Sequence, residues 1–229
     1  MAKRFTPQLD ILPLAQRRLW TELGTLPGEF VLYGGTALAL HLGHRQSIDF
    51  DFFADRDIDP SDLYRRVPFL KGAAITQQEP NTLTCLIGRS EPVKVSFFGL
   101  PHLGRLRVPH VSADNSLKVA SLLDLAATKV AVVQQRAEAK DYRDIDALIT
   151  AGIDLPRALA AAKLVYGQAF APTPTLKALT FFGDGDLLTL PDDVKQRLVA
   201  AAAAVDPLQL PKLKKSAGRT QHPDGDRDR

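Results

Sequence analysis

The sequence predicts an α+β fold in which strands and helices share the first half of the chain and helices alone form the second. Two observations support this prediction. Short β-branched and aromatic runs, which are typical of strands, occur mainly before about residue 115. Beyond that point the apolar residues recur at helical spacing. We therefore expect an α/β core over residues 1–115 and a helical part over residues 116–211.

The composition is that of a globular protein and excludes several classes. The chain has 229 residues, 45% hydrophobic and 24% charged, enough for one large domain or two small ones. The single cysteine, Cys85, excludes a disulfide framework and a multi-cysteine zinc site. No apolar run approaches the roughly 18 residues of a membrane span, and the start "MAKRFTPQLD" lacks a signal-peptide pattern. We expect a soluble, cytoplasmic protein with no membrane partner.

The net charge of +3 comes from one end of the chain. Residues 212–229 hold six of the 29 basic residues and three of the 26 acidic residues, which accounts for the whole net charge. This composition predicts a disordered, solvated tail. A basic arm that holds RNA is the alternative. Because charges of the two signs balance over residues 1–211, no basic surface is expected over the whole molecule.

In the first half, most predicted elements have a local signal. "EFVLYGG" indicates a short buried strand that ends in a glycine turn, and "TALALHLG" indicates a short helix that ends at Gly43. Asp59 and Pro60 are typical of a helix start, as cap and first helical residue. "GRSEP" has a turn composition, so the strands beside it should form a hairpin. Strands are thus predicted at 30–33, 47–53, 82–87 and 93–98, and a first helix at 8–23.

The second half has the pattern of successive helices. Ser121, followed three residues later by Asp124, resembles a capping box that opens a helix running to about residue 136. The next helix should begin near Lys140 and stop at Gly152. Further helices are predicted at 156–168, 174–181 and 192–204, with "APTPTL" as a break before the second of them.

The strand within "YGGTALALHLGHRQSIDFDFF" contains two acids among apolar residues. Side chains at positions i and i+2 of a strand share a face, so Asp49 and Asp51 should project together, while Ile48, Phe50 and Phe52 point into the core. Carboxylates in an apolar strand are costly unless something pairs with them. Two adjacent carboxylates suit Mg²⁺, or Mn²⁺, with substrate phosphates as further ligands of the metal.

The glycine turn ahead of this strand supplies the second half of the predicted site. Gly34 and Gly35 open a helix at Thr36, whose free N–H groups favour phosphate. A bare tight turn, or an exposed edge strand for the acids, would explain either feature alone. Their ordered combination is more specific, and it is distinct from a Walker A loop and from G-x-G-x-x-G. Together they predict a site for a metal-bound nucleoside triphosphate.

The string "GGTALALHLGHRQSIDFDFF" closely resembles the signature of the AbiEii/AbiGii-type nucleotidyltransferases. These are bacterial toxin-like proteins of the polymerase-β-like nucleotidyltransferase superfamily, and they include the mycobacterial MenT-type enzymes, which transfer nucleotides to tRNA. The similarity runs from about residue 28 to residue 150. It implies a polymerase-β-like core with a small mixed sheet, followed by a helical part that closes the cleft.

The resemblance also implies roles for residues of this motif. The expected phosphate and metal ligands are Gly34, Gly35, Thr36, Asp49 and Asp51. Arg45 and Ser47 lie in the same motif and are expected near the nucleotide. The alternatives are a solvent-exposed arginine for Arg45 and a residue that merely begins the strand for Ser47.

Lys129 stands in the middle of an apolar stripe. On a helix over "LLDLAATKVAVV", Leu122, Leu125, Ala126 and Val133 share one face, and Lys129 falls among them. Such a lysine either extends its ammonium group to solvent or meets an anion. In the second interpretation Lys129 points into the cleft and contacts a triphosphate as a point charge.

Asp141 lies near a predicted helix start, beside the apolar face of that helix. A favourable interaction with the helix dipole is the simpler interpretation. "ATKVAVVQQRAEAKDYRDI" also resembles later motifs of the family, where a lysine and then an aspartate complete the active site. Matched by position, these are Lys129 and Asp141, with Asp141 as the candidate base. Arg136 is a further candidate for a nucleotide contact, and Asp144 is an alternative to Asp141.

The sequence departs from the superfamily pattern at Ser96. A third carboxylate usually stands on a later strand as the base that activates the attacking hydroxyl, and in "VKVSFF" this position falls on Ser96. Serine is a poor metal ligand and has no useful basicity near neutral pH. Either Asp141 takes over the role, or transfer is reduced or lost.

We therefore expect a Mg²⁺-dependent, toxin-like nucleotidyltransferase that moves a nucleotide from an NTP to an RNA, most plausibly a tRNA end, or to a protein hydroxyl. A cognate antitoxin is a further expected partner. The first alternative is a catalytically degenerate module that binds nucleotide or protein within a toxin–antitoxin-type system. The second alternative is a purely structural partner of a neighbouring gene product.

Overall fold

A single mixed sheet runs through the first half of the chain in this computed structural model, which describes residues 2–214. Its strand order is β1-β7-β8-β2-β3-β6-β5-β4. The pairs β1–β7, β2–β8 and β3–β6 are parallel, and the other pairs are antiparallel. The strands are β1 (Arg4–Phe5), β2 (Val31–Tyr33), β3 (Phe50–Ala54), β4 (Ala74–Glu79), β5 (Thr82–Gly88), β6 (Pro92–Gly99), β7 (His110–Ser112) and β8 (Lys118–Val119). The mixed sheet confirms the predicted fold class.

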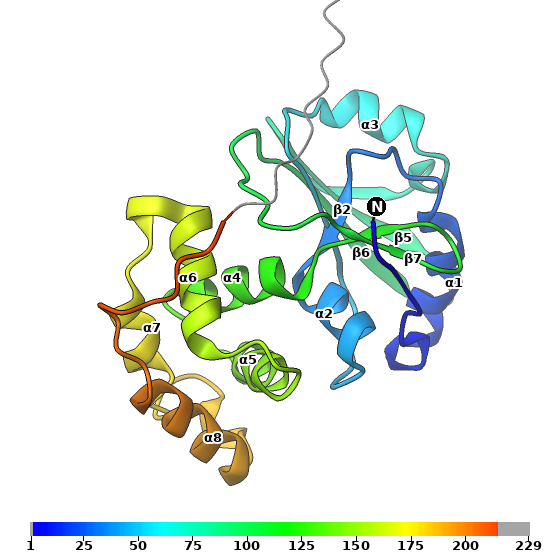
Figure 1. Ribbon diagram of the computed structural model, residues 1–229. Helices are drawn as coiled ribbons and strands as arrows, with labels where there is room; N and C mark the ends of the chain where they lie inside the picture. Colours follow the sequence, from blue (N-terminus) through cyan, green and yellow to red (C-terminus); the bar gives the residue numbers. More distant parts are fainter. Residues whose placement is uncertain (1, 215–229) are drawn as a thin grey trace, which may run out of the picture.

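Within the described residues, five α-helices follow the sheet and form the helical part. Figure 1 shows α5 to α8 grouped at one end of the molecule, while α1 and α3 lie with the sheet. Between them, α4 packs against α2, α5 and α6. The helices are α1 (Leu14–Leu23), α2 (Gly34–Leu42), α3 (Pro60–Arg66), α4 (Leu122–Val132), α5 (Ala139–Thr150), α6 (Leu155–Tyr166), α7 (Pro172–Ala178) and α8 (Asp192–Ala203).

The local signals of the sequence mark the helix ends correctly. The carboxylate of Asp59 accepts hydrogen bonds from the N–H groups of Ser61 and Asp62, at 2.9 and 3.1 Å, and so caps α3. Ser121 caps α4 by accepting from the N–H of Asp124. Gly43 ends α2 in the left-handed conformation, with φ of 65°. These motifs depend on neighbouring residues alone, which is why the sequence predicts them.

Two boundaries differ from the predictions, and a third lies largely outside the described residues. The first predicted helix is divided, with a short 3₁₀ turn (Leu9–Ile11) ahead of Pro13 and α1 behind it, because proline lacks the N–H that a helix interior needs. The sheet continues past residue 115, since β8 pairs in parallel with β2. The predicted tail at 212–229 lies outside the described residues from 215 onward, and Arg107 donates to the carbonyl of Lys214 at 2.8 Å.

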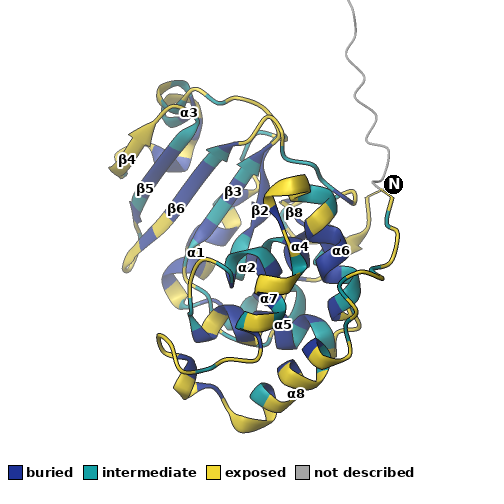
Figure 2. Ribbon diagram, turned by 90° about the vertical axis from the view of Figure 1, so that its left-hand side faces the viewer, coloured by how far each residue is buried: buried dark blue, intermediate teal, exposed yellow. Residues whose placement is uncertain are grey.

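The two faces of the sheet have different neighbours. Phe50, Phe52 and Phe97 are fully buried on the core face, where Trp20 of α1 stacks on Phe50. Figure 2 shows the central strands buried and β4 exposed at the edge. The opposite face turns toward α2 and α4. Within residues 2–214, no helix is both long and apolar enough to cross a membrane.

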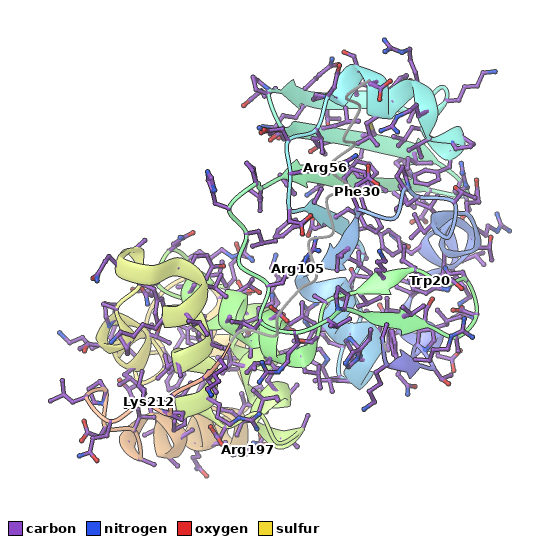
Figure 3. All side chains as sticks on the ribbon, turned by 45° about the horizontal axis from the view of Figure 1, so that its top comes forward. Trp20, Phe30, Arg56, Arg105, Arg197 and Lys212 are labelled. Carbon is purple, nitrogen blue, oxygen red and sulfur yellow. The ribbon has the colours of Figure 1, made fainter. Side chains whose placement is uncertain are left out.

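Side-chain hydrogen bonds also fix the connections between the halves. The loop after β6 is held by Asp124, whose carboxylate accepts from the N–H groups of Leu106 and Arg107 at 2.7 and 3.2 Å. Within the helical part, Arg197 of α8 makes a two-point ion pair with Asp146 of α5, at 2.7 and 2.8 Å. Figure 3 labels Arg197 and, in the loop after β6, Arg105.

Replacing Phe97 by alanine should destabilise the protein strongly. Its ring lies 5.4 Å from that of Phe52 and 5.2 Å from that of Phe30, and it is fully buried. Loss of such a side chain costs about 3–5 kcal/mol of unfolding free energy, measurable by urea denaturation. Phe97→Leu is the control and should cost clearly less. A loss below about 1 kcal/mol for Phe97→Ala would contradict this packing.

Candidate functional site

The two predicted acids lie at the start of β3, on the face of the sheet that turns toward α4. Asp51 pairs with Tyr33 of β2 on one side and with Ser96 of β6 on the other. Asp49 immediately precedes the strand and lines the same cavity as Asp51. The prediction for Ile48 was wrong: it lies before the strand and is 58% exposed. The acids therefore share one face, while Phe50 and Phe52 point to the other face and fill the core.

The glycine turn lies directly against these acids. Gly34 begins α2 with φ of +71°, and a Cβ atom there would lie 2.8 Å from Oδ2 of Asp51. At Gly35 a Cβ atom would collide with the guanidinium of Arg45 and approach Oγ of Ser47 at 3.3 Å. The positive φ of Gly34 favours glycine, and a larger residue at Gly35 would have to displace the guanidinium of Arg45. No side chain caps the start of α2, so its first N–H groups are free of side-chain partners.

Thr36 ties this motif together instead of lining the cavity. It is buried, and its hydroxyl is hydrogen-bonded to Oγ of Ser47 at 2.8 Å and to the carbonyl of Asp49. Its side chain therefore fixes the approach to β3 relative to the first turn of α2. A direct phosphate contact by this hydroxyl, as the resemblance implies, would require these bonds to break.

A cavity of about 550 Å³ opens over the acids and the start of α2. Its charged lining consists of two acids and five cations, namely Asp49, Asp51, Arg45, Lys94, Lys129, Arg136 and Lys140. Gly35 and Ser47 complete the predicted residues that line it. The excess of cations suits an anionic ligand, and the acid pair suits a divalent cation.

The environment of Asp51 favours an added positive charge. Burial, followed by the charge of Asp49, raises the pKa of Asp51. The ammonium of Lys94 lies 3.4 Å from Oδ2 of Asp49, a long contact between two half-exposed groups. Within residues 2–214 no cluster of three or more His, Cys, Asp and Glu residues could hold a metal. A cation held by this pair would therefore complete its coordination with oxygens of water or of a bound ligand.

Lys129 is buried and held by two carboxylates. Its ammonium donates to Oδ1 of Asp141 at 2.7 Å and lies 2.6 Å from Oδ2 of Asp144. Both acids come from α5, one turn apart, and neither side chain is exposed. Lys129 also lines the cavity. It therefore meets anions of the protein itself, at the boundary of the cavity.

Asp141 does not line the cavity, and its environment does not suit a base. Burial alone would raise its pKa, but hydrogen bonds from Arg136 and the charge of Lys129 outweigh burial and lower it. Arg136 donates to its two oxygens at 2.7 and 3.2 Å. Each oxygen thus already accepts a charged hydrogen bond, so the geometry favours a structural role beneath Lys129.

Asp144 has as many charged partners as Asp141, although the sequence singled it out less. Arg45 binds it through two hydrogen bonds of 2.6 and 2.8 Å, and Nε2 of His44 lies 2.7 Å from Oδ1. Burial would raise its pKa, but these partners and Lys129 lower it. Arg45 is therefore not a free surface arginine, because it connects the α2–β3 turn to α5.

Ser96 lies beside Asp51 on the neighbouring strand β6. It is buried, pairs in register with Asp51, and accepts from the hydroxyl of Thr84 at 3.4 Å. Of the acids, only Asp49 and Asp51 line the described cavity.

Sequence reasoning missed Lys94 and Lys140 as lining residues. Lys94 alternates with Ser96 along β6 and so faces the acids, a signal that was present in the strand pattern. Lys140 precedes Asp141 at the start of α5, where only the packing of α5 against α2 brings it to the cavity. No local pattern predicts that contact.

Comparison with solved structures defines the fold as that of nucleotidyltransferases. The nucleotidyltransferase toxin MenT4 from Mycobacterium tuberculosis H37Rv aligns with a TM-score of 0.58 and 16% identity, over 82% of this chain and 83% of MenT4. A protein from H. pylori assigned as a nucleotidyltransferase aligns with a TM-score of 0.51 and 15% identity, over 82% of this chain and 90% of that one.

The chain belongs to the AbiEii family of nucleotidyltransferase toxins of type IV toxin–antitoxin systems. Residues 18–215 match this family, which confirms the resemblance of the motifs. An uncharacterised protein of Aquifex aeolicus (strain VF5) is 33% identical over 119 residues. That match covers 51% of this chain and 56% of the other protein, so it spans little more than half of the relative.

Replacing Asp144 by asparagine should destabilise the protein, because it leaves the charges of Lys129 and Arg45 without their shared carboxylate. Breaking a buried pair costs about 3–5 kcal/mol. The lowered pKa of Asp144 means that this stabilisation is present above the unfolded pKa of about 3.9 and is lost as the pH falls. The unfolding free energies of the two proteins should therefore differ by a constant amount near pH 7, and the difference should begin to narrow only below about pH 4.

Asp193→Asn is the matched control, because Asp193 pairs with Arg197 in an exposed position. It should change stability little at either pH. Equal stability of Asp144→Asn and the unchanged protein at pH 7 would contradict a stabilising role for the ion pairs of Asp144 with Lys129 and Arg45.

Proposed function

We propose that this protein is a Mg²⁺-dependent nucleotidyltransferase that transfers a nucleotide from an NTP to a hydroxyl group. One observation carries the proposal: Asp49, Asp51 and the uncapped start of α2 face one cavity whose remaining charged lining is cationic. An acid pair beside a cationic wall suits a metal-bound triphosphate, which carries both charges.

The residues present fit a divalent cation. Asp49 and Asp51 offer hard oxygen donors on one face, and the raised pKa of Asp51 reflects repulsion and burial that a cation would relieve. When bound, such a cation would neutralise charge that develops on the transferred phosphoryl group. The family and the donor set support a divalent metal. Carboxylate oxygens suit Mg²⁺ and Mn²⁺ alike.

The other residues of the cavity would bind and orient the triphosphate. The N–H groups at Gly34, Gly35 and Thr36 offer donors at a helix start, where an anion is favoured. Lys129 and Arg136 border the same cavity and would add charge-assisted contacts. Asp141 and Asp144 would act as positioning residues, because they fix the ammonium of Lys129 from below.

In the reaction, the acceptor oxygen would form a bond to the α-phosphorus as the bond to pyrophosphate breaks, and the hydroxyl proton would pass to solvent. The half-exposed Lys94 and Lys140 at the cavity suit an acceptor that carries phosphates, which favours RNA, such as a tRNA end, over a protein hydroxyl. Membership of a toxin family makes a cognate antitoxin a proposed partner and the cytoplasm the proposed location.

A second candidate function is a nucleotide-binding module without chemistry, and Ser96 favours it. Asp141 cannot easily replace the missing third carboxylate, because it is buried and its pKa is low. Calorimetry with each NTP and Mg²⁺, run beside a transfer assay on total tRNA, separates the two. Binding without product over long incubation would support the module.

Asp49→Asn should reduce transfer of labelled nucleotide by at least about 100-fold, because half of the metal-binding pair loses its charge. Asp49 is 42% exposed at its side chain, so the variant should fold normally, which circular dichroism and thermal unfolding would check. Mg²⁺-dependent NTP binding should weaken in parallel.

Glu79→Gln serves as the control, since Glu79 is an exposed acid on β4, the edge strand far along the sheet from β3. It should retain full transfer. A folded Asp49→Asn variant with normal activity would refute the proposed site.

A further inference from the structure

A second, smaller cavity lies beside Gly34 and shares two lining residues with the first. Its volume is about 130 Å³, and its walls are Tyr33, Phe53, Thr128 and Val132. Lys129 and Arg136 border both cavities, so the two spaces share one cationic boundary. The first cavity has a mostly charged lining, whereas the second is mostly aromatic and aliphatic.

Strand alternation explains this division. Along β3, Asp51 and Phe53 lie two residues apart and therefore point to the same face of the sheet. Tyr33 pairs with Asp51 across β2 and β3, and its ring stacks on that of Phe53 with centroids 4.7 Å apart. The acid and the aromatic pair are thus neighbours on one face, about 7 Å apart along the strand.

Helix α4 provides the opposite wall. Thr128 and Val132 are four residues apart, so they lie on one side of α4, next to Lys129. The hydroxyl of Thr128 donates to the carbonyl of Leu125 at 2.8 Å and so is occupied within its own helix. The cavity therefore lies between the stacked rings of Tyr33 and Phe53 and an aliphatic helix surface, with Lys129 and Arg136 as its charged border.

We propose that this second cavity binds the base of the nucleoside triphosphate. The inference rests on the proposed function, which places the phosphates at Gly34, Gly35 and the shared cations. A cavity of ~150 Å³ in another protein holds a benzene ring, so about 130 Å³ accepts one six-membered ring, with any second ring toward the opening. Stacking on aromatic side chains favours bases over other apolar groups.

The same lining determines how selective the site is. A pocket that hydrogen-bonds a ligand's polar edge rejects analogues by large factors, whereas an apolar pocket discriminates weakly. Bases of one size should therefore bind alike: CTP should match UTP, and ATP should match GTP, within about fivefold.

The test compares NTPs with inorganic tripolyphosphate, which has the phosphates and no base. Dissociation constants with Mg²⁺ are measured by calorimetry for the unchanged protein and for Val132→Trp, which fills the second cavity. Val132→Trp should weaken all four NTPs at least about tenfold and leave tripolyphosphate within about twofold. Val199→Trp on α8, where Val199 is 39% exposed, is the control and should change neither.

A second variant removes the aromatic face without filling the second cavity. Phe53→Leu should weaken NTP binding by roughly 5- to 100-fold, the range of base–aromatic stacking, and again spare tripolyphosphate. Equal weakening of NTPs and tripolyphosphate, or no weakening of NTPs by either variant, would overturn the base site alone. If the unchanged protein binds neither ligand with Mg²⁺, the proposed function fails, and the base site fails with it.

Discussion

The candidate site depends on one buried group of charges, in which Asp141 and Asp144 of α5 enclose the ammonium of Lys129. Two carboxylates without solvent exposure are unstable unless cations reach them. Those cations come from separate segments: Lys129 from α4, Arg136 from the α4–α5 connection and Arg45 from the α2–β3 turn. The requirement to neutralise two acids therefore fixes where the helical part sits against the glycine turn, and so forms one wall of the cavity.

The opposite wall follows from the two-residue period of β3. In "DFDFF" the phenylalanines at 50 and 52 enter the core, which leaves Asp49, Asp51 and Phe53 on the outer face. Core packing thus determines the orientation of the acids, because a one-residue shift in register would bury them and expose the phenylalanines. Stability and site geometry come from the same alternation, which couples a charged cavity to an aromatic one along a single strand.

This coupling separates what the sequence predicts from what it does not. Helix caps such as Asp59 and Ser121, and the alternation of Asp49 with Asp51, arise from residues close together in the chain, and pattern reasoning finds them. The two partners of Lys129, Asp141 and Asp144, lie 12 and 15 residues away on another helix, so these ion pairs require the packing of α4 on α5. The sequence does not predict β4, because this strand is exposed along its whole length and lacks alternation of polar and apolar residues. It also gives Phe53 the pattern of a core residue, whereas the structure places Phe53 opposite α4.

Serine at position 96 leaves Asp49 and Asp51 as the only acids among the residues that line the described cavity. A third acid beside Asp51 would add to the repulsion that already raises its pKa, and it would also repel the triphosphate. Of the five cations that line the cavity, Arg45, Lys129 and Arg136 are paired with the buried Asp141 and Asp144, while Lys94 approaches Asp49 at 3.4 Å. Under the proposed function, serine at position 96 would lessen repulsion of the triphosphate but would provide no base for the attacking hydroxyl. This one position therefore bears on both candidate functions, the transferase and the module that only binds.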